Sequence, residues 1–95
     1  MAVRVLIERN IDLGQEPKLH QLLTQLRAKA MEVKGYISGE TLRALDDPKR
    51  FLVISTWNSI EEWKAWQNNP ERKKLQEEVN KLLRTPETTT VFTNI

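Results

Sequence analysis

Hydrophobic positions follow two different periods in the first third of the chain. Apolar and polar residues alternate over residues 2–10, which predicts a β-strand. From Leu19 to Val33 the apolar residues recur at steps of three and four, which predicts an amphipathic helix over residues 15–34. Gly35 follows as the expected left-handed cap of that helix.

Three more strands are predicted in the rest of the chain. Residues 36–45 and 51–57 predict two strands joined by a turn that contains Pro48, and the second of them is the most apolar and β-branched segment of the sequence. Residues 88–95 predict the last strand.

Two helix-start signals lie before that last strand. Ser59 and Glu62 have the spacing of a capping box. Asn69 and Pro70 combine a preferred N-cap residue with a proline in the first helical turn. A short helix and a third helix, which ends before Pro86, are therefore expected between the third and fourth strands.

The resulting element order is β-α-β-β-α-α-β, in a single domain over residues 1–95. With right-handed crossovers, this order predicts an α+β fold, the ferredoxin-like split β-α-β sandwich. In that fold an antiparallel sheet carries its helices on one face.

Both faces of the expected sheet carry apolar residues. The third strand has Phe51, Val53 and Trp57 on one side and Leu52 and Ile54 on the other, and the second has Tyr36 and Leu42 opposed by Ile37 and Leu45. Because the helices cover only one face, the other needs a partner. We therefore expect a homodimer that packs through the open sheet face.

Composition limits the chemistry and the partners. The chain has no cysteine, which excludes disulfides and thiolate catalysis. Its net charge is +2, and its densest basic segment, residues 72–74, is followed by Glu77 and Glu78, which favours a solvated helix face over a nucleic-acid patch. No segment has the length and apolar character of a signal peptide or a membrane span. We expect a cytoplasmic protein without a nucleic-acid or membrane partner.

All three tryptophans of the chain lie close together, at positions 57, 63 and 66. Large amphipathic rings favour cores, interfaces and ligand pockets. Trp57 ends the buried third strand, so we expect it in the core or an interface, and Trp63 is placed to anchor the helix start after Ser59. Trp66 lies at the edge of the core face, where it can roof a cavity between helices and sheet.

The segment around these tryptophans resembles a known family. Residues 56–66, followed by Pro70 and Arg72, are similar to the antibiotic biosynthesis monooxygenase domain, and so are residues 35–42 and Phe51. The likeness covers nearly the whole chain. It implies a dimeric α+β barrel built from two ferredoxin-like halves. It also implies an activity among those of the family, which include cofactor-free oxygenation of polyketide aromatics, haem degradation and quinol oxidation.

The resemblance also implies particular site residues. Trp66 matches a pocket tryptophan on the short helix of haem-degrading members. Those members have an iron-ligating histidine one helix later, where this chain has Gln76, so haem degradation is disfavoured and no cofactor is expected. They also use an asparagine near the end of the first strand, where either Arg9 or Asn10 falls. The only histidine, His20, lies beside the buried helix stripe and is expected at the surface.

Two further side chains are candidates for substrate contact. The hydroxyl of Tyr36 can act as an acid or hydrogen-bond a phenol, although packing with a solvent-exposed hydroxyl is the simpler expectation. Arg72 has a two-pronged donor for an oxygen anion. The simpler expectation for Arg72 is a surface salt bridge, for which Glu62 is the better-placed carboxylate.

The sequence contains no acid–base pair, catalytic triad or metal-ligand cluster that spacing would indicate. A cofactor-free oxygenase does not need one, because a deprotonated phenol or hydroquinone can itself pass an electron to O₂ in an apolar pocket with one or two donors. We therefore expect a cofactor-independent monooxygenase or oxidoreductase acting on a small aromatic or quinol-type substrate. The alternative is a non-enzymatic ligand-binding or interaction homodimer on the same fold. An RNA-binding module shares the element order, but the stacking aromatics are missing.

Overall fold

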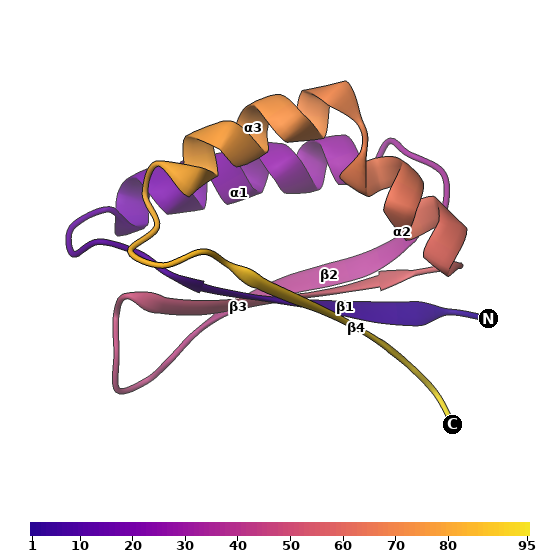
Figure 1. The fold of residues 1–95 in the computed structure, drawn as a ribbon, viewed down its shortest axis with the longest axis horizontal. Helices are drawn as coiled ribbons and strands as arrows, with labels where there is room; N and C mark the ends of the chain where they lie inside the picture. The colour runs from indigo at the N-terminus through magenta and orange to yellow at the C-terminus, as the bar shows by residue number, and fades with distance from the viewer.

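A four-stranded antiparallel sheet forms one layer of the molecule and three helices form the other (Figure 1). The computed structural model describes residues 1–95. Its elements are β1 (Val3–Asn10), α1 (Glu16–Ala30), β2 (Tyr36–Arg43), β3 (Arg50–Trp57), α2 (Ile60–Gln67), α3 (Pro70–Asn80) and β4 (Thr88–Thr93). The strand order is β2-β3-β1-β4. This confirms the predicted ferredoxin-like α+β fold.

The pleat of β1 separates the two faces of the sheet. Val3, Val5 and Ile7 are buried beneath the helices. Helix α1 covers them with the apolar stripe that its sequence predicts, formed by Leu19, Leu22, Leu26 and Ala30. Arg9 lies on the same face of β1 and is also buried, which places a charged side chain at the end of an otherwise apolar row.

Helix α1 ends earlier than predicted. The sequence indicates a helix to residue 34, whereas the structure ends it at Ala30. The N–H of Glu32 donates to the carbonyl of Lys29, and the N–H of Val33 donates to that of Ala30, so three-residue turns replace the helical spacing. Val33 still packs against the core, which is why its apolar periodicity continues past the helix.

Strand β2 contains an irregularity that simple alternation does not predict. Tyr36 pairs with Trp57 on the helix side of the sheet, while Leu42 pairs with Leu52 on the open side. The register shifts between these pairs because Ile37 is an extra residue in a β-bulge. The prediction that Tyr36 and Leu42 share one face was therefore wrong.

The face of the sheet opposite the helices is not covered by any element of the chain (Figure 1). Strand pairing places on it five apolar residues, namely Leu6, Leu42, Leu52, Ile54 and Phe92. Leu42 and Phe92 are 44% and 50% exposed. Charged and hydroxyl side chains separate these residues, so the face combines apolar and polar groups.

Both predicted helix-start signals are confirmed. The N–H of Glu62 donates to Ser59 Oγ at 3.2 Å, and the Ser59 hydroxyl donates to Glu62 Oε1 at 3.0 Å. The N–H groups of Glu71 and Arg72 both donate to Asn69 Oδ1. These caps fix where α2 and α3 begin, and with them the positions of the side chains in their first turns.

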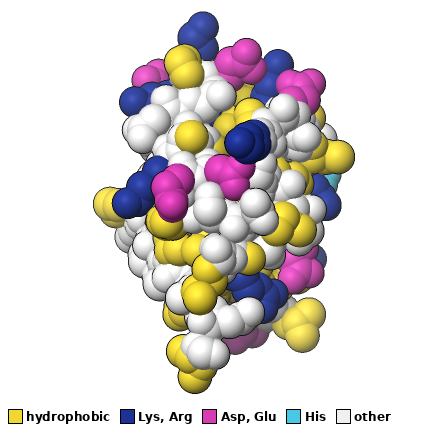
Figure 2. Space-filling view, turned by 90° about the vertical axis from the view of Figure 1, so that its right-hand side faces the viewer, with side chains coloured by type: hydrophobic (Ala, Val, Ile, Leu, Met, Phe, Trp, Pro, Cys, Tyr) yellow, Lys and Arg dark blue, Asp and Glu magenta, His cyan; other side chains and the backbone are white.

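The outer surface carries charges of both signs. Figure 2 shows the end of the molecule that bears α2 and the two termini, where basic, acidic and hydrophobic side chains are interspersed.

None of the helices has the length and hydropathy needed to cross a bilayer.

Gly35 and Gly14 provide a matched test of the α1–β2 connection. Both have a positive φ, +94° and +89°. A Cβ on Gly35 would lie 2.5 Å from Glu62 Cβ, whereas a Cβ on Gly14 would meet open space. We expect Gly35→Ala to destabilise the fold by about 3 kcal/mol and Gly14→Ala by about 1 kcal/mol. Urea unfolding of both variants measures the difference, and equal losses would show that the contact with Glu62 has no effect.

Candidate functional site

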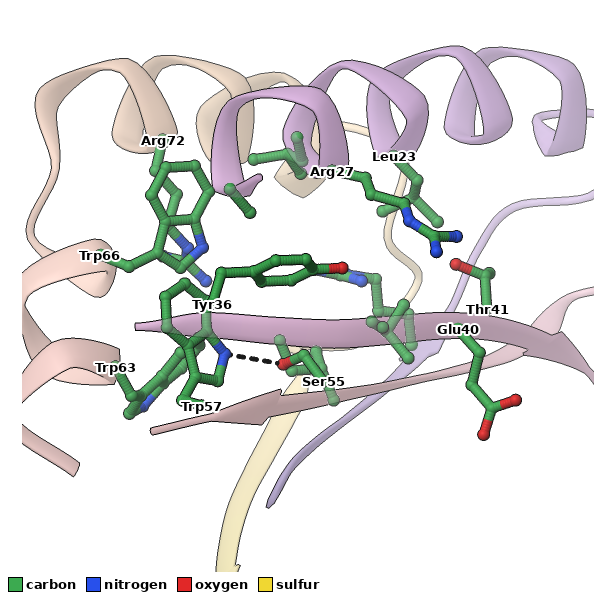
Figure 3. Close-up of a pocket in the computed structure, with 16 residues that line it drawn as sticks. Leu23, Arg27, Tyr36, Glu40, Thr41, Ser55, Trp57, Trp63, Trp66 and Arg72 are labelled. Atoms are coloured by element: carbon green, nitrogen blue, oxygen red, sulfur yellow. Dashed lines mark hydrogen bonds between the residues drawn. The ribbon is translucent and has the colours of Figure 1, made fainter. Parts of the chain in front are cut away.

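A cavity of about 80 Å³ lies between the helices and the sheet (Figure 3). Strands β1, β2 and β3 contribute its floor, and all three helices contribute to its walls. Its lining is mainly apolar and aromatic, with three arginines, Arg9, Arg27 and Arg72, among the polar groups. Apolar walls with a few convergent polar groups are typical of a small-molecule site.

Trp57 is the centre of an aromatic cluster at one end of this cavity. Its ring centroid lies 5.4 Å from that of Tyr36, 5.8 Å from that of Trp63 and 6.2 Å from that of Trp66. The Tyr36 contact is edge-on, and the Trp66 ring is stacked at 24°. The indole N–H of Trp57 donates to Ser55 Oγ at 3.1 Å. This bond satisfies the only polar group of the buried ring, which would otherwise have no partner.

The tryptophans cannot be divided into structural and functional members. All three are buried in the core, and all three line the cavity. The contact between Trp57 and Trp63 agrees with the expectation that Trp63 anchors the start of α2. Trp66 lies at the cavity as its position on the helix predicts, and Figure 3 shows it above Trp57 and beside Arg72.

The Tyr36 ring extends across the cavity (Figure 3). The sequence favours a hydroxyl in solvent, whereas the structure lays that hydroxyl over Gly39, where an added Cβ would lie 2.7 Å from it. A residue without a side chain at position 39 therefore gives the ring room to lie flat along the sheet. The hydroxyl points toward the part of the cavity lined by Arg27 and Thr41.

Arg9 introduces a charge at the base of the cavity. Its side chain is 2% exposed, and its Nε donates to Glu87 Oε1 at 2.8 Å. The Nε2 of Gln76 donates to the same carboxylate oxygen at 2.8 Å. The Nη1 of Arg9 is buried and has no hydrogen-bond partner in the protein.

Glu87 is a site residue that the sequence analysis did not identify. It lies between α3 and β4, 78 residues from Arg9 along the chain. No local motif marks such a contact, because neither helical nor strand periodicity relates positions so far apart. The only available signal was the alternation of the first strand, which, if continued from Ile7, buries Arg9, and a buried arginine requires a carboxylate from somewhere in the chain.

Arg72 is buried as well, at the start of α3. Its guanidinium carbon lies 5.4 Å from the centre of the Trp63 ring, and its Nη1 donates to the Gln67 carbonyl at 3.4 Å. The pKa of Arg72 is lowered from its usual value, mainly because the guanidinium is buried. The negative charge of Glu87 opposes this shift, and the positive charge of Arg9 adds to it. The predicted surface salt bridge with Glu62 was wrong, because Arg72 turns inward onto the ring while Glu62 is bonded to Ser59.

Four of the six candidate contact residues, Arg9, Tyr36, Trp66 and Arg72, line the cavity. Asn10 does not, because the next position along a strand faces the other side of the sheet, and it is exposed there. Gln76 lies outside the cavity, where it supports Glu87 and donates to Asn80 Oδ1 at 2.9 Å. His20 is exposed. No three His, Cys, Asp or Glu side chains lie close enough together to hold a metal ion.

The fold and the site together define the class of this protein. It is an α+β domain with an aromatic cavity between its helices and its sheet. The chain matches the antibiotic biosynthesis monooxygenase family over residues 2–78, and it belongs to that family. It is 29% identical over 69 residues to protein SchA of Streptomyces halstedii. That match covers 73% of this chain and 18% of SchA, so the chain spans less than a fifth of the length of this relative.

Solved structures share the fold. A conserved protein from Methanosarcina mazei Go1 has a TM-score of 0.91 at 13% identity, over 97% of this chain and 91% of that one. SnoaB, a cofactor-independent oxygenase from Streptomyces nogalater, has a TM-score of 0.90 at 14% identity, over 99% of this chain and 93% of that one. At these identities the likeness concerns the fold.

The Arg9–Glu87 pair is tested by removing one partner and then both. We expect Glu87→Ala to destabilise the fold by about 3 kcal/mol, because a buried guanidinium loses its counter-charge. The double variant Arg9→Met/Glu87→Ala should recover most of that loss, since an apolar pair needs no charge compensation. Urea unfolding gives both values. As a control, Asp12→Ala removes the exposed partner of Arg84 and should change stability by at most about 0.5 kcal/mol. Additive losses in the double variant would contradict the coupling.

Proposed function

We propose that this protein is a cofactor-independent monooxygenase that oxidises a small aromatic or quinol-type substrate in the cavity beside Trp66. The observation that carries the proposal is the lining of this cavity, in which tryptophan and tyrosine rings lie beside buried arginine donors. Membership of the monooxygenase family supports the same reaction class. The fold shared with SnoaB, which works without a cofactor, is consistent with it.

The chemistry requires little from the protein. An electron-rich aromatic anion transfers an electron to O₂, and the two radicals then combine at a ring carbon. Oxidation of a ring methylene to a carbonyl in this way uses one O₂ molecule, since one oxygen atom enters the product and the other leaves as water with the two methylene hydrogens. The protein has to bind the flat ring, exclude water and stabilise the anion with fixed donors. The aromatic rings that can bind the substrate and the arginines that can stabilise its anion are in the lining of the same cavity.

Oxygen uptake with a panel of hydroquinones and anthrones tests this proposal. The parent protein should consume O₂ well above the spontaneous rate of each substrate. Trp66→Leu should lower that rate about tenfold or more, because a flat substrate loses its stacking wall, whereas Trp66→Phe should retain most of it. Uptake no faster than the spontaneous rate with every substrate would reject the enzyme. Tryptophan fluorescence quenched by the same compounds without uptake would then favour a ligand-binding protein.

We also propose that two copies pack through the open sheet face. The apolar residues on this face and the dimeric architecture implied by the family resemblance support this arrangement. Light scattering at micromolar concentration should give twice the mass of one chain. The variant Leu42→Lys/Phe92→Lys should be monomeric, because charges would replace apolar contacts at the interface. Leu45→Lys, in the exposed β2–β3 turn, is the control that should remain dimeric. A monomeric parent would rule out the dimer.

A further inference from the structure

We propose that the Arg9 guanidinium is the oxyanion site of this cavity, so that the aromatic ligand binds as a phenolate or enolate with its oxygen on Arg9 Nη1. This inference rests on the proposed function for the kind of ligand, and it adds the protonation state and the residue that selects it. The reacting oxygen would lie at the base of the cavity, with the ring between Arg9 and the aromatic cluster.

The first observation is an unsatisfied charged donor. Arg9 is 2% exposed, lines the cavity and leaves Nη1 without a partner in the protein. Buried polar groups are paired in the great majority of cases, and an unpaired charged donor is more costly than a neutral one. An oxygen anion in the cavity supplies the missing acceptor. It would form a charge-assisted hydrogen bond, which is stronger than a bond to a neutral hydroxyl.

The second observation is that Arg9 is held in place from one side only. Glu87 accepts from its Nε and leaves the rest of the donor fork free. Glu87 is in turn held by Gln76, whose amide donates to the same carboxylate oxygen. The guanidinium is thus oriented before a ligand arrives, which reduces the entropic cost of binding. Glu87 and Gln76 are positioning residues in this scheme.

The third observation is the charge balance around the cavity. The ionisable groups that line it are Arg9 from β1, Arg27 from α1, Tyr36 and Glu40 from β2, and Arg72 from α3, while Glu87 contacts it through Arg9. Glu40 is exposed at the edge of the open face, so the partly buried Glu87 is the one carboxylate that faces the two buried arginines. The interior therefore has an excess positive charge, which favours a ligand anion over the neutral form.

The probe for this site is para-nitrophenol, whose anion absorbs visible light while the neutral phenol does not. Its electron-poor ring makes it a ligand that is not readily oxidised. In the parent protein, the affinity for total probe should rise with pH up to the pKa of the free probe and then level off. The bound phenol should titrate at least about one pH unit lower than the free phenol, equivalent to a tenfold preference for the anion. An affinity that is flat or falls over this range would overturn the inference without any variant.

Variants then assign the preference to Arg9. The double variant Arg9→Gln/Glu87→Gln removes both charges of the pair together, so it leaves neither ion without its partner. It should bind the neutral phenol about as well as the parent does and lose the preference for the anion. Arg84→Gln removes one exposed positive charge away from the cavity and should keep the full preference. A double variant that folds, judged by its circular dichroism, and still prefers the anion tenfold would overturn the assignment to Arg9.

The outcome is separable from the test of the proposed function, because binding of this probe does not depend on turnover. Preference for the anion without O₂ uptake from any substrate would reject the oxygenase and leave the oxyanion site in place. O₂ uptake without any preference for the anion would support the oxygenase and overturn the role of Arg9.

Discussion

The burial of one guanidinium is the constraint on which the site and the sheet around it depend. Arg9 occupies a position of β1 that lies in line with Val3, Val5 and Ile7, all of them in the core. A charge there requires a carboxylate, and Glu87 supplies it from the segment that leads into β4. The pair therefore connects the central strand to the last one at the base of the cavity. Because Glu87 satisfies only Nε, the same interaction that makes the burial tolerable also leaves a free donor beside the aromatic rings.

The walls of the cavity and the core of the protein are built from the same side chains. Trp57 is the last residue of β3, and its ring contacts Trp63 and Trp66 on α2. It also contacts Tyr36, with which it pairs in the sheet next to the bulge of β2. A ring at this position stabilises the packing of α2 on the sheet and also shapes the space next to it. Stability and ligand binding are consequently linked here. Arg72, stacked on Trp63, adds a second buried cation to a region that could have been purely apolar.

Local patterns predicted most of the fold, and they failed where distant residues meet. Apolar periodicity and the two cap signals identified every strand and helix, because these features act within a few residues of the chain. The bulge at Ile37 escaped prediction, since a strand of uniform alternation carries no mark of an extra residue. The family resemblance indicated the first-strand position but left Arg9 and Asn10 open. The buried face of β1 distinguishes them, and Glu87 required the folded chain, because its contact joins residues 78 apart.

A crystal structure of the protein with bound para-nitrophenolate tests the central claim most directly. The measured quantity is the distance between the phenolate oxygen and Arg9 Nη1. A buried oxyanion site predicts about 2.7–2.9 Å, with the ring of the ligand against the tryptophan cluster and the Arg9–Glu87 bond unchanged. A ligand bound outside the cavity, or one whose oxygen faces solvent while Arg9 Nη1 still lacks an acceptor, would contradict it.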